Sequence, residues 1–132
     1  MSVGINPDLA SNWLAATTRN IPFVVPQNCI QLHVGDPGSA GTANPSAVTF
    51  RMAASFASPV ETSGTMTVST TGTPPSWNMT APETISYISV WDALTGGSWL
   101  WIARLNLPQV VANGDLFTMG GGVSLAITGL AA

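Results

Sequence analysis

The sequence predicts an all-β protein, a single antiparallel β-sandwich-like domain preceded by a short helical arm. Two observations carry this prediction. From Cys29 onward, apolar and polar residues alternate with the period of two that is typical of half-buried strands, in short runs separated by Gly, Pro, Asn and Asp. Residues 6–17, in contrast, have the 3.6-residue period of a helix. We therefore expect an N-terminal arm over residues 1–27 and a β domain over residues 28–132.

The helix signal begins at Asn6, a residue type that caps helix N-termini well. Pro7 suits the first helical position, and Asp8 complements the helix dipole. One face carries the apolar residues Leu9, Ala10, Trp13 and Leu14. A helix of about three turns is marginal alone, so this face must dock on its own domain or on a neighbouring subunit. We expect Leu9, Trp13 and Leu14 to make assembly contacts.

The connector and the first strands follow from local patterns. Pro22 and Pro26 favour an extended connector. Alternation predicts strands over residues 29–34, 48–52 and 66–70. The first of these ends at Asp36-Pro37-Gly38, which is typical of a turn.

The strongest strand signal spans residues 84–107 and predicts a hairpin that turns between Asp92 and Gly97. Both of its faces are largely apolar, as expected for central strands that are covered on two sides. We therefore expect its tryptophans, Trp91, Trp99 and Trp101, to form the core. A turn at Asn113-Gly114-Asp115 and a last strand over residues 123–127 complete the domain.

Charged residues make up only 7% of the chain, against about 25% in a typical globular protein. Interface cores are depleted in charge and enriched in Trp and Met, so this composition favours a subunit of an assembly. The net charge of −3 and the lack of lysine argue against nucleic acid and anionic membranes as partners. A single cysteine, Cys29, allows no internal disulfide. We expect no signal peptide or membrane span, and synthesis in a cytoplasm.

Residues with catalytic potential are few and isolated. His33 is the only histidine, and no metal ligand stands at ligand spacing beside it. Cys29 lies four residues away on the same strand, roughly 13 Å distant, so the two cannot touch. Asp36, Asp92 and Asp115 could bind Ca²⁺ together, but a turn role explains each of them. We predict no enzyme, no catalytic residue, no metal and no cofactor.

The tryptophans have a second interpretation, an aromatic platform for sugars. Trp77 follows Pro74-Pro75-Ser76 in a predicted loop and is the tryptophan that we expect to be exposed. A carbohydrate-binding module for host recognition is therefore the alternative function. Loss of host adsorption in a Trp77→Ala variant that still assembles would favour it.

Three stretches together resemble a family of small virion proteins of tailed bacteriophages, especially those that infect actinobacteria. The first, residues 30–44, is similar to the pattern LHxGDPGxxGTAN. The second, residues 88–101, is similar to a GLWDAxTGG hairpin followed by an LW strand. The third, Val111 to Asp115 with the glycine-rich step into Val123-Ser124-Leu125, resembles VNAGDxxxxxxGxLxxxL. Pro22 to Pro26 and the Trp-rich hairpin depart from the family.

The resemblance covers about residues 28–128. It implies a tail-fibre or minor tail protein, or a capsid decoration protein of similar size, and it implies no catalytic residues. The partners that we expect are other virion proteins of the capsid or tail, further copies of the chain as a trimer, and in the alternative a host-surface glycan. The protein would be made in the host cytoplasm and reside in the virion.

Overall fold

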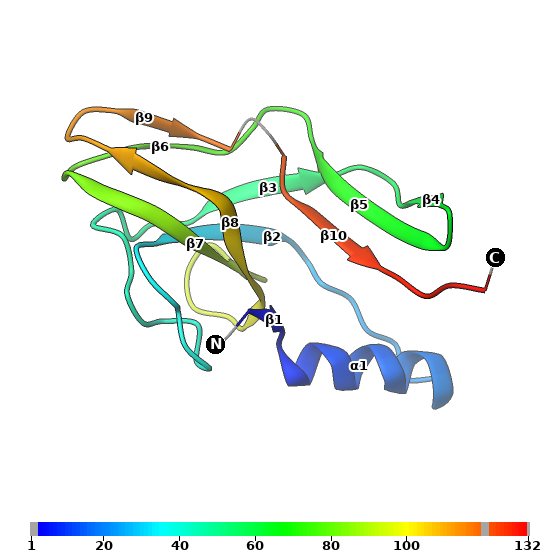
Figure 1. The fold of residues 1–132 in the computed structure, drawn as a ribbon. Coiled ribbons are helices and arrows are strands. Elements are labelled where there is room, and N and C mark those ends of the chain that lie inside the picture. The colour runs from blue at the N-terminus through cyan, green and yellow to red at the C-terminus, as the bar shows by residue number, and fades with distance from the viewer. Residues whose placement is uncertain (1–2, 120–121, 132) are drawn as a thin grey trace.

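The computed structural model describes residues 3–119 and 122–131, so Gly120 and Gly121 of the glycine-rich step lie outside it. Within this part the protein is all-β with one short helix, as predicted (Figure 1). The elements, in chain order, are β1 (Gly4–Ile5), α1 (Pro7–Thr18), β2 (Asn28–His33), β3 (Met52–Phe56), β4 (Val60–Thr62), β5 (Thr65–Thr71), β6 (Ser76–Asn78), β7 (Glu83–Trp91), β8 (Trp99–Val111), β9 (Leu116–Thr118) and β10 (Ser124–Ile127).

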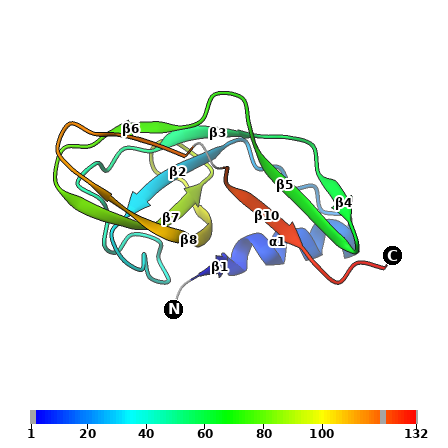
Figure 2. The same cartoon turned by 45° about the horizontal axis from the view of Figure 1, so that its top comes forward.

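Most strands belong to one antiparallel sheet in the order β1-β8-β7-β2-β3-β5-β10, with β4 attached to β5. The layers arise because this sheet curls, while β6 and β9 form a separate two-stranded ribbon (Figure 2). The strand β2 lies in the middle of the order, where Ile30 is opposite Val90 of β7 on one side and Met52 of β3 on the other. Among the described residues, the β1-β8 edge of the sheet does not pair with the β10 edge.

The curled sheet encloses the apolar core. Four residues of β2, including Ile30 and Leu32, are fully buried, because the strand has elements on both faces. The turn half of the β7–β8 hairpin is buried on both faces as well, which confirms the prediction for Trp91 and Trp101, while Trp99 is half-buried. The far half of β8, by contrast, is mostly exposed. The hairpin pattern therefore indicates a central strand pair correctly only near its turn.

The helix α1 begins as the sequence predicts. Pro7 is its first residue, and the side chain of Asn6 accepts a hydrogen bond from the Asp8 amide at 2.8 Å. The amide of Asn6 also donates to the Leu100 carbonyl, and its side-chain nitrogen donates to the Trp99 carbonyl. One residue thus caps the helix and ties its start to β8.

Arg51 holds the turn between β7 and β8. Its Nη1 donates to the carbonyl oxygens of Ala93 at 2.8 Å and Gly96 at 2.7 Å. Its guanidinium lies 3.8 Å from the centroid of the Trp91 ring, a cation–π geometry. Inside the turn, the Asp92 carboxylate accepts from the Ser98 amide at 2.9 Å. The predicted turn is therefore correct, and one of the three arginines stabilises it.

The strand predicted over residues 48–52 is wrong, because the strand in this region is β3, at Met52–Phe56. At Ala47 and Phe50, the backbone before β3 forms hydrogen bonds with side chains and not with a neighbouring strand. The amide of Ala47 donates to the Glu83 carboxylate, and the carbonyl of Phe50 accepts from the Trp77 indole. Val48 is buried but Phe50 is 53% exposed, so the alternating apolar residues of this segment do not share one buried face. The short strands β1, β4, β6 and β9 were not predicted, because two or three residues are too few for a periodic signal.

The turn offers a matched pair of substitutions. Gly96 and Gly97 both have positive φ, at 65° and 71°. A Cβ on Gly96 meets nothing within 4 Å, whereas a Cβ on Gly97 would collide with the Asp92 carboxylate. We expect Gly96→Ala to lower the free energy of unfolding by about 1 kcal/mol through backbone strain alone. Gly97→Ala should cost roughly 1–2 kcal/mol more, because it also displaces the bond to Ser98.

Urea denaturation followed by tryptophan fluorescence measures both free energies. Equal losses in the two variants would contradict a structural role for the Asp92 carboxylate in the turn.

Candidate functional site

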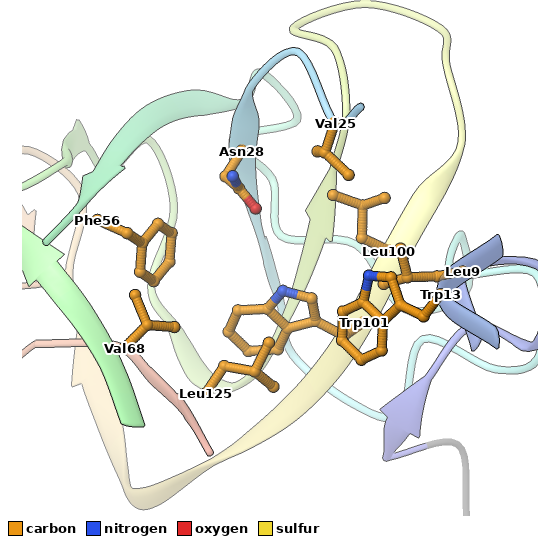
Figure 3. A pocket seen from close by; sticks show the side chains of 9 residues that line it. All are labelled: Leu9, Trp13, Val25, Asn28, Phe56, Val68, Leu100, Trp101 and Leu125. Carbon is orange, nitrogen blue, oxygen red and sulfur yellow. The ribbon is translucent and has the colours of Figure 1, made fainter. Parts of the chain in front are cut away.

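An apolar pocket of about 220 Å³ lies where the curled sheet stays open, between the β8 edge and the β5–β10 edge. Figure 3 shows its walls: Leu9 and Trp13 from α1, Leu100 and Trp101 from β8, and Val68 and Leu125 from β5 and β10. Phe56 of β3 and Val25 of the connector complete the apolar lining. Concave, mainly apolar sites with a few polar groups are where proteins commonly bind ligands or partner side chains. We therefore take this pocket as the candidate interaction site.

Few polar groups reach the pocket. Asn28, the first residue of β2, points its side-chain amide toward the indole of Trp101 (Figure 3). Trp101 is only 5% exposed, yet its indole N–H has no hydrogen-bond partner among the described residues. No fully buried side-chain nitrogen or oxygen in that part of the chain lacks a partner, so the indole nitrogen retains access to the pocket space. A donor and an amide thus remain available in an apolar wall.

The three residues expected to make assembly contacts have different environments. Leu9 is 5% exposed and belongs to the core of the chain itself. Trp13 is half-buried, packs against that core and lines the pocket. Leu14 is 66% exposed. Within one copy, α1 therefore uses Leu9 and Trp13 to cover the sheet and leaves Leu14 available to another molecule.

The expectation that Trp77 is exposed is wrong, because its side chain is only 1% exposed. The predicted loop is strand β6, which pairs with β9 and sets Trp77 against Phe117 with ring centroids 6.0 Å apart. The indole N–H donates to the Phe50 carbonyl at 3.2 Å, so its polar atom is satisfied in the interior. Trp77 is a core residue and offers no sugar platform.

His33 is fully buried and belongs to a chain of hydrogen bonds. Its Nδ1–H donates to the Ala43 carbonyl at 2.9 Å, and its Nε2 accepts from the Ser89 hydroxyl at 2.8 Å. The indole N–H of Trp91 donates to the same hydroxyl oxygen at 2.8 Å. This pattern fits the neutral imidazole, and burial lowers the pKa of His33. Both Ser89 and His33 are inaccessible, so the pair joins β2, β7 and the loop at Ala43 and offers no nucleophile to solvent.

The three aspartates that were considered as Ca²⁺ ligands each accept a hydrogen bond within their own turn. Asp36 accepts from the Gly38 amide, Asp92 from the Ser98 amide and Asp115 from the Ala112 amide, each at 2.9 Å. Among residues 3–119 and 122–131, no group of three or more His, Cys, Asp or Glu side chains is placed to hold a metal ion. Burial raises the pKa of the Cys29 thiol, although Arg51 opposes the shift, so the thiol stays protonated at neutral pH.

A second apolar surface lies at the far end of the sheet. Leu107 and Val110 on β8 and Leu116 at the start of β9 are all strongly exposed. The register of β7 and β8 is shifted between Ile85 and Tyr87, at the level where Pro108 lies in β8.

In the described part of the chain, no helix is both long and apolar enough to cross a bilayer.

The pocket was not predicted from the sequence. Its lining comes from α1, the connector and five strands, which are brought together only by the curl of the sheet. Asn28 and Leu125 have ordinary positions in their local patterns and carry no motif. The only sequence feature that pointed to this region was the amphipathic helix, because its apolar face was expected to pack on the domain or on a neighbouring subunit.

Comparison with known proteins adds one finding. A family model described as podophage GP4 fiber I protein gp80 matches residues 5–125. The match covers most of the chain, including α1, the pocket and nearly all of the sheet. No curated protein matches the sequence.

The buried histidine leads to a pH prediction. The pKa of His33 is lower in the folded protein than the ordinary value near 6.5, so the unfolded chain binds the proton more readily. The stabilisation is therefore complete above pH ~6.5 and is lost as the pH falls from there to the lowered pKa of the folded state. The free energy of unfolding should decrease by up to about 1.4 kcal/mol per pH unit in that window.

Urea denaturation at intervals between pH 5 and 8 measures this slope. His33 is the only histidine, so a His33→Gln variant has no imidazole that titrates. The variant should be less stable at pH 8 but should have a flatter profile below pH ~6.5. An unchanged slope would show that other groups cause the pH dependence.

Proposed function

The chain belongs to the podophage GP4 fiber I protein gp80 family, and from this membership we propose that it is a non-enzymatic structural subunit of a phage tail fibre. The observation that carries the proposal is the family match over residues 5–125. A surface poor in charge, with exposed Leu14, Leu107 and Leu116, supports a protein that packs against other protein. The buried state of His33 and Ser89 offers no accessible catalytic pair.

The subunit assembles, in this proposal, as a symmetric trimer and contacts other virion proteins. Most soluble homo-oligomers close through a rotation axis, which requires self-complementary or head-to-tail apolar patches. Leu14 of α1 and Leu107, Val110 and Leu116 of the β8–β9 end are strongly exposed. The two elements lie at different places on one copy (Figure 1), and in this proposal the trimer contact is made by α1. From the sequence resemblance we also propose an actinobacterial host, with synthesis of the chain in its cytoplasm.

In this proposal the assembly contact of the N-terminal arm narrows to Leu14, beside Trp13. Leu9 already fills the core of its own copy, and β1 pairs with β8 through Gly4 and Ile5. Removing residues 1–20 would therefore expose the core as well as the proposed contact. A substitution at the exposed position separates the two effects.

Capsid decoration and glycan binding are the two alternatives to a tail-fibre subunit. Capsid decoration is distinguished from a tail location by where the protein is found in the particle. The glycan-binding alternative loses its residue, because Trp77 is in the core.

The first experiment is quantitative mass spectrometry of separated heads and tails from purified particles. We expect the protein in the tail fraction, in copy numbers consistent with fibres. Hundreds of copies in the head fraction would indicate a capsid decoration protein. Its absence from both fractions would overturn the virion assignment.

The assembly contact has a matched test in two variants. Leu14 on α1 is 66% exposed and Leu116 on β9 is 64% exposed, so an aspartate at either position should leave the fold intact. We expect Leu14→Asp to reduce trimer formation and particle incorporation at least tenfold, because a buried unpaired charge at an interface is strongly unfavourable. Leu116→Asp should assemble nearly normally.

Sedimentation velocity and particle mass spectrometry measure the two effects, and circular dichroism checks the fold. The opposite result, loss in Leu116→Asp alone, would move the interface to the β8–β9 end. Normal assembly of Leu14→Asp would remove α1 from the interface.

A further inference from the structure

The apolar pocket between α1, β8 and β10 is incompletely used by the chain itself. Its volume of about 220 Å³ exceeds that of an engineered apolar cavity of about 150 Å³ in another protein, which binds benzene. An aromatic side chain therefore fits. Flat apolar surfaces are present on its walls in the rings of Trp13, Trp101 and Phe56 (Figure 3).

The polar groups of the pocket restrict the occupant further. The indole N–H of Trp101 has no hydrogen-bond partner in the described part of the chain, although the residue is only 5% exposed. The Asn28 amide points toward it and carries both an acceptor and donors (Figure 3). One hydroxyl can accept from the indole and donate to the amide oxygen. A purely apolar occupant would remove water from both groups and replace neither bond.

Other occupants fit these groups less well. A sugar ring carries several hydroxyls, whereas among the described lining residues the side chains with polar atoms are Asn28, Trp13 and Trp101. Among protein side chains, tyrosine combines a large apolar ring with one hydroxyl. The only tyrosine of this chain, Tyr87, is half-buried on the central strand β7 between β2 and β8, a position with little reach into the pocket of another copy.

We propose that the pocket receives a tyrosine side chain from a different virion protein, with its hydroxyl bonded to the Trp101 indole and the Asn28 amide. This inference rests on the proposed function, since it names the chemistry by which the subunit is held in the particle. The ring packs between α1 and the β5–β10 edge, so the partner segment lies across the open side of the curled sheet.

The test uses p-cresol as the tyrosine side-chain probe and p-xylene as its match in shape without the hydroxyl. Each is titrated into the ¹⁵N-labelled full chain, and the five tryptophan indole N–H signals are followed by NMR. We expect the largest shift at Trp101 and a Kd for p-cresol roughly fivefold to tenfold lower than for p-xylene. Equal affinities, no binding up to the solubility limit, or a largest shift at another tryptophan would overturn the proposal.

Two variants separate the hydroxyl contact from the fold. Asn28→Leu should raise the Kd of p-cresol to that of p-xylene, while the same change at the exposed Asn78 of β6 should alter neither. If p-cresol retains its advantage in Asn28→Leu, the assigned contact is wrong. Circular dichroism and signal dispersion show whether each variant is folded.

A third variant, Leu125→Trp, fills the pocket and connects it with the particle. We expect it to abolish binding of both probes and to lower incorporation into particles at least tenfold. Normal incorporation would refute the partner tyrosine while the wild-type protein is still found in virions. Absence of the wild-type protein from particles would instead refute the proposed function, and probe binding would be unaffected.

Discussion

In the described part of the chain the two edges of the sheet are not paired with each other, and most of the architecture is organised around this constraint. With β2 in the middle of the order, the sheet curls from β1-β8 on one side to β10 on the other. A sheet that curls without closing leaves part of its apolar interior facing outward. The helix α1 covers part of that opening with Leu9 and Trp13, and the uncovered remainder is the pocket. The capping contacts of Asn6 with β8 set the position of the helix and so the width of the opening.

The few polar side chains of the interior serve connections between segments that are distant in sequence. The chain from Trp91 through Ser89 and His33 to Ala43 joins β7, β2 and the following loop. Arg51 reaches the turn between β7 and β8 from the segment before β3. Such buried bonds have little net strength each, but leaving one partner unsatisfied is costly, so they select one arrangement of the loops. Only 7% of the residues are charged, and surface ion pairs contribute little stability in general. The long-range polar contacts described above are therefore hydrogen bonds.

Periodic and local signals allowed much of the fold to be predicted. The cap at Asn6, the strands β2, β5 and β10 and the β7–β8 hairpin all follow from patterns within about a dozen residues. Strands of two or three residues give no periodic signal, and the other errors arise because tertiary contacts override local pattern. The two prolines before Trp77 predict a loop, yet the pairing of β6 with β9 buries this side chain. The pocket residues come from segments between Leu9 and Leu125, and no local window contains their relation.

The central position of β2 also determines the order in which the protein can fold during synthesis. Cys29 of β2 is opposite Trp91, and Ile5 of β1 is opposite Trp101. The strand β3 follows β2 closely, but β1 and the side of β2 that faces β7 leave the ribosome long before their partner strands have been made. These two edges must stay unpaired until the β7–β8 hairpin emerges, a hairpin of local contacts that forms early. The apolar residues of these unpaired edges are exposed during synthesis of the middle of the chain, which is the stage at which aggregation competes with folding.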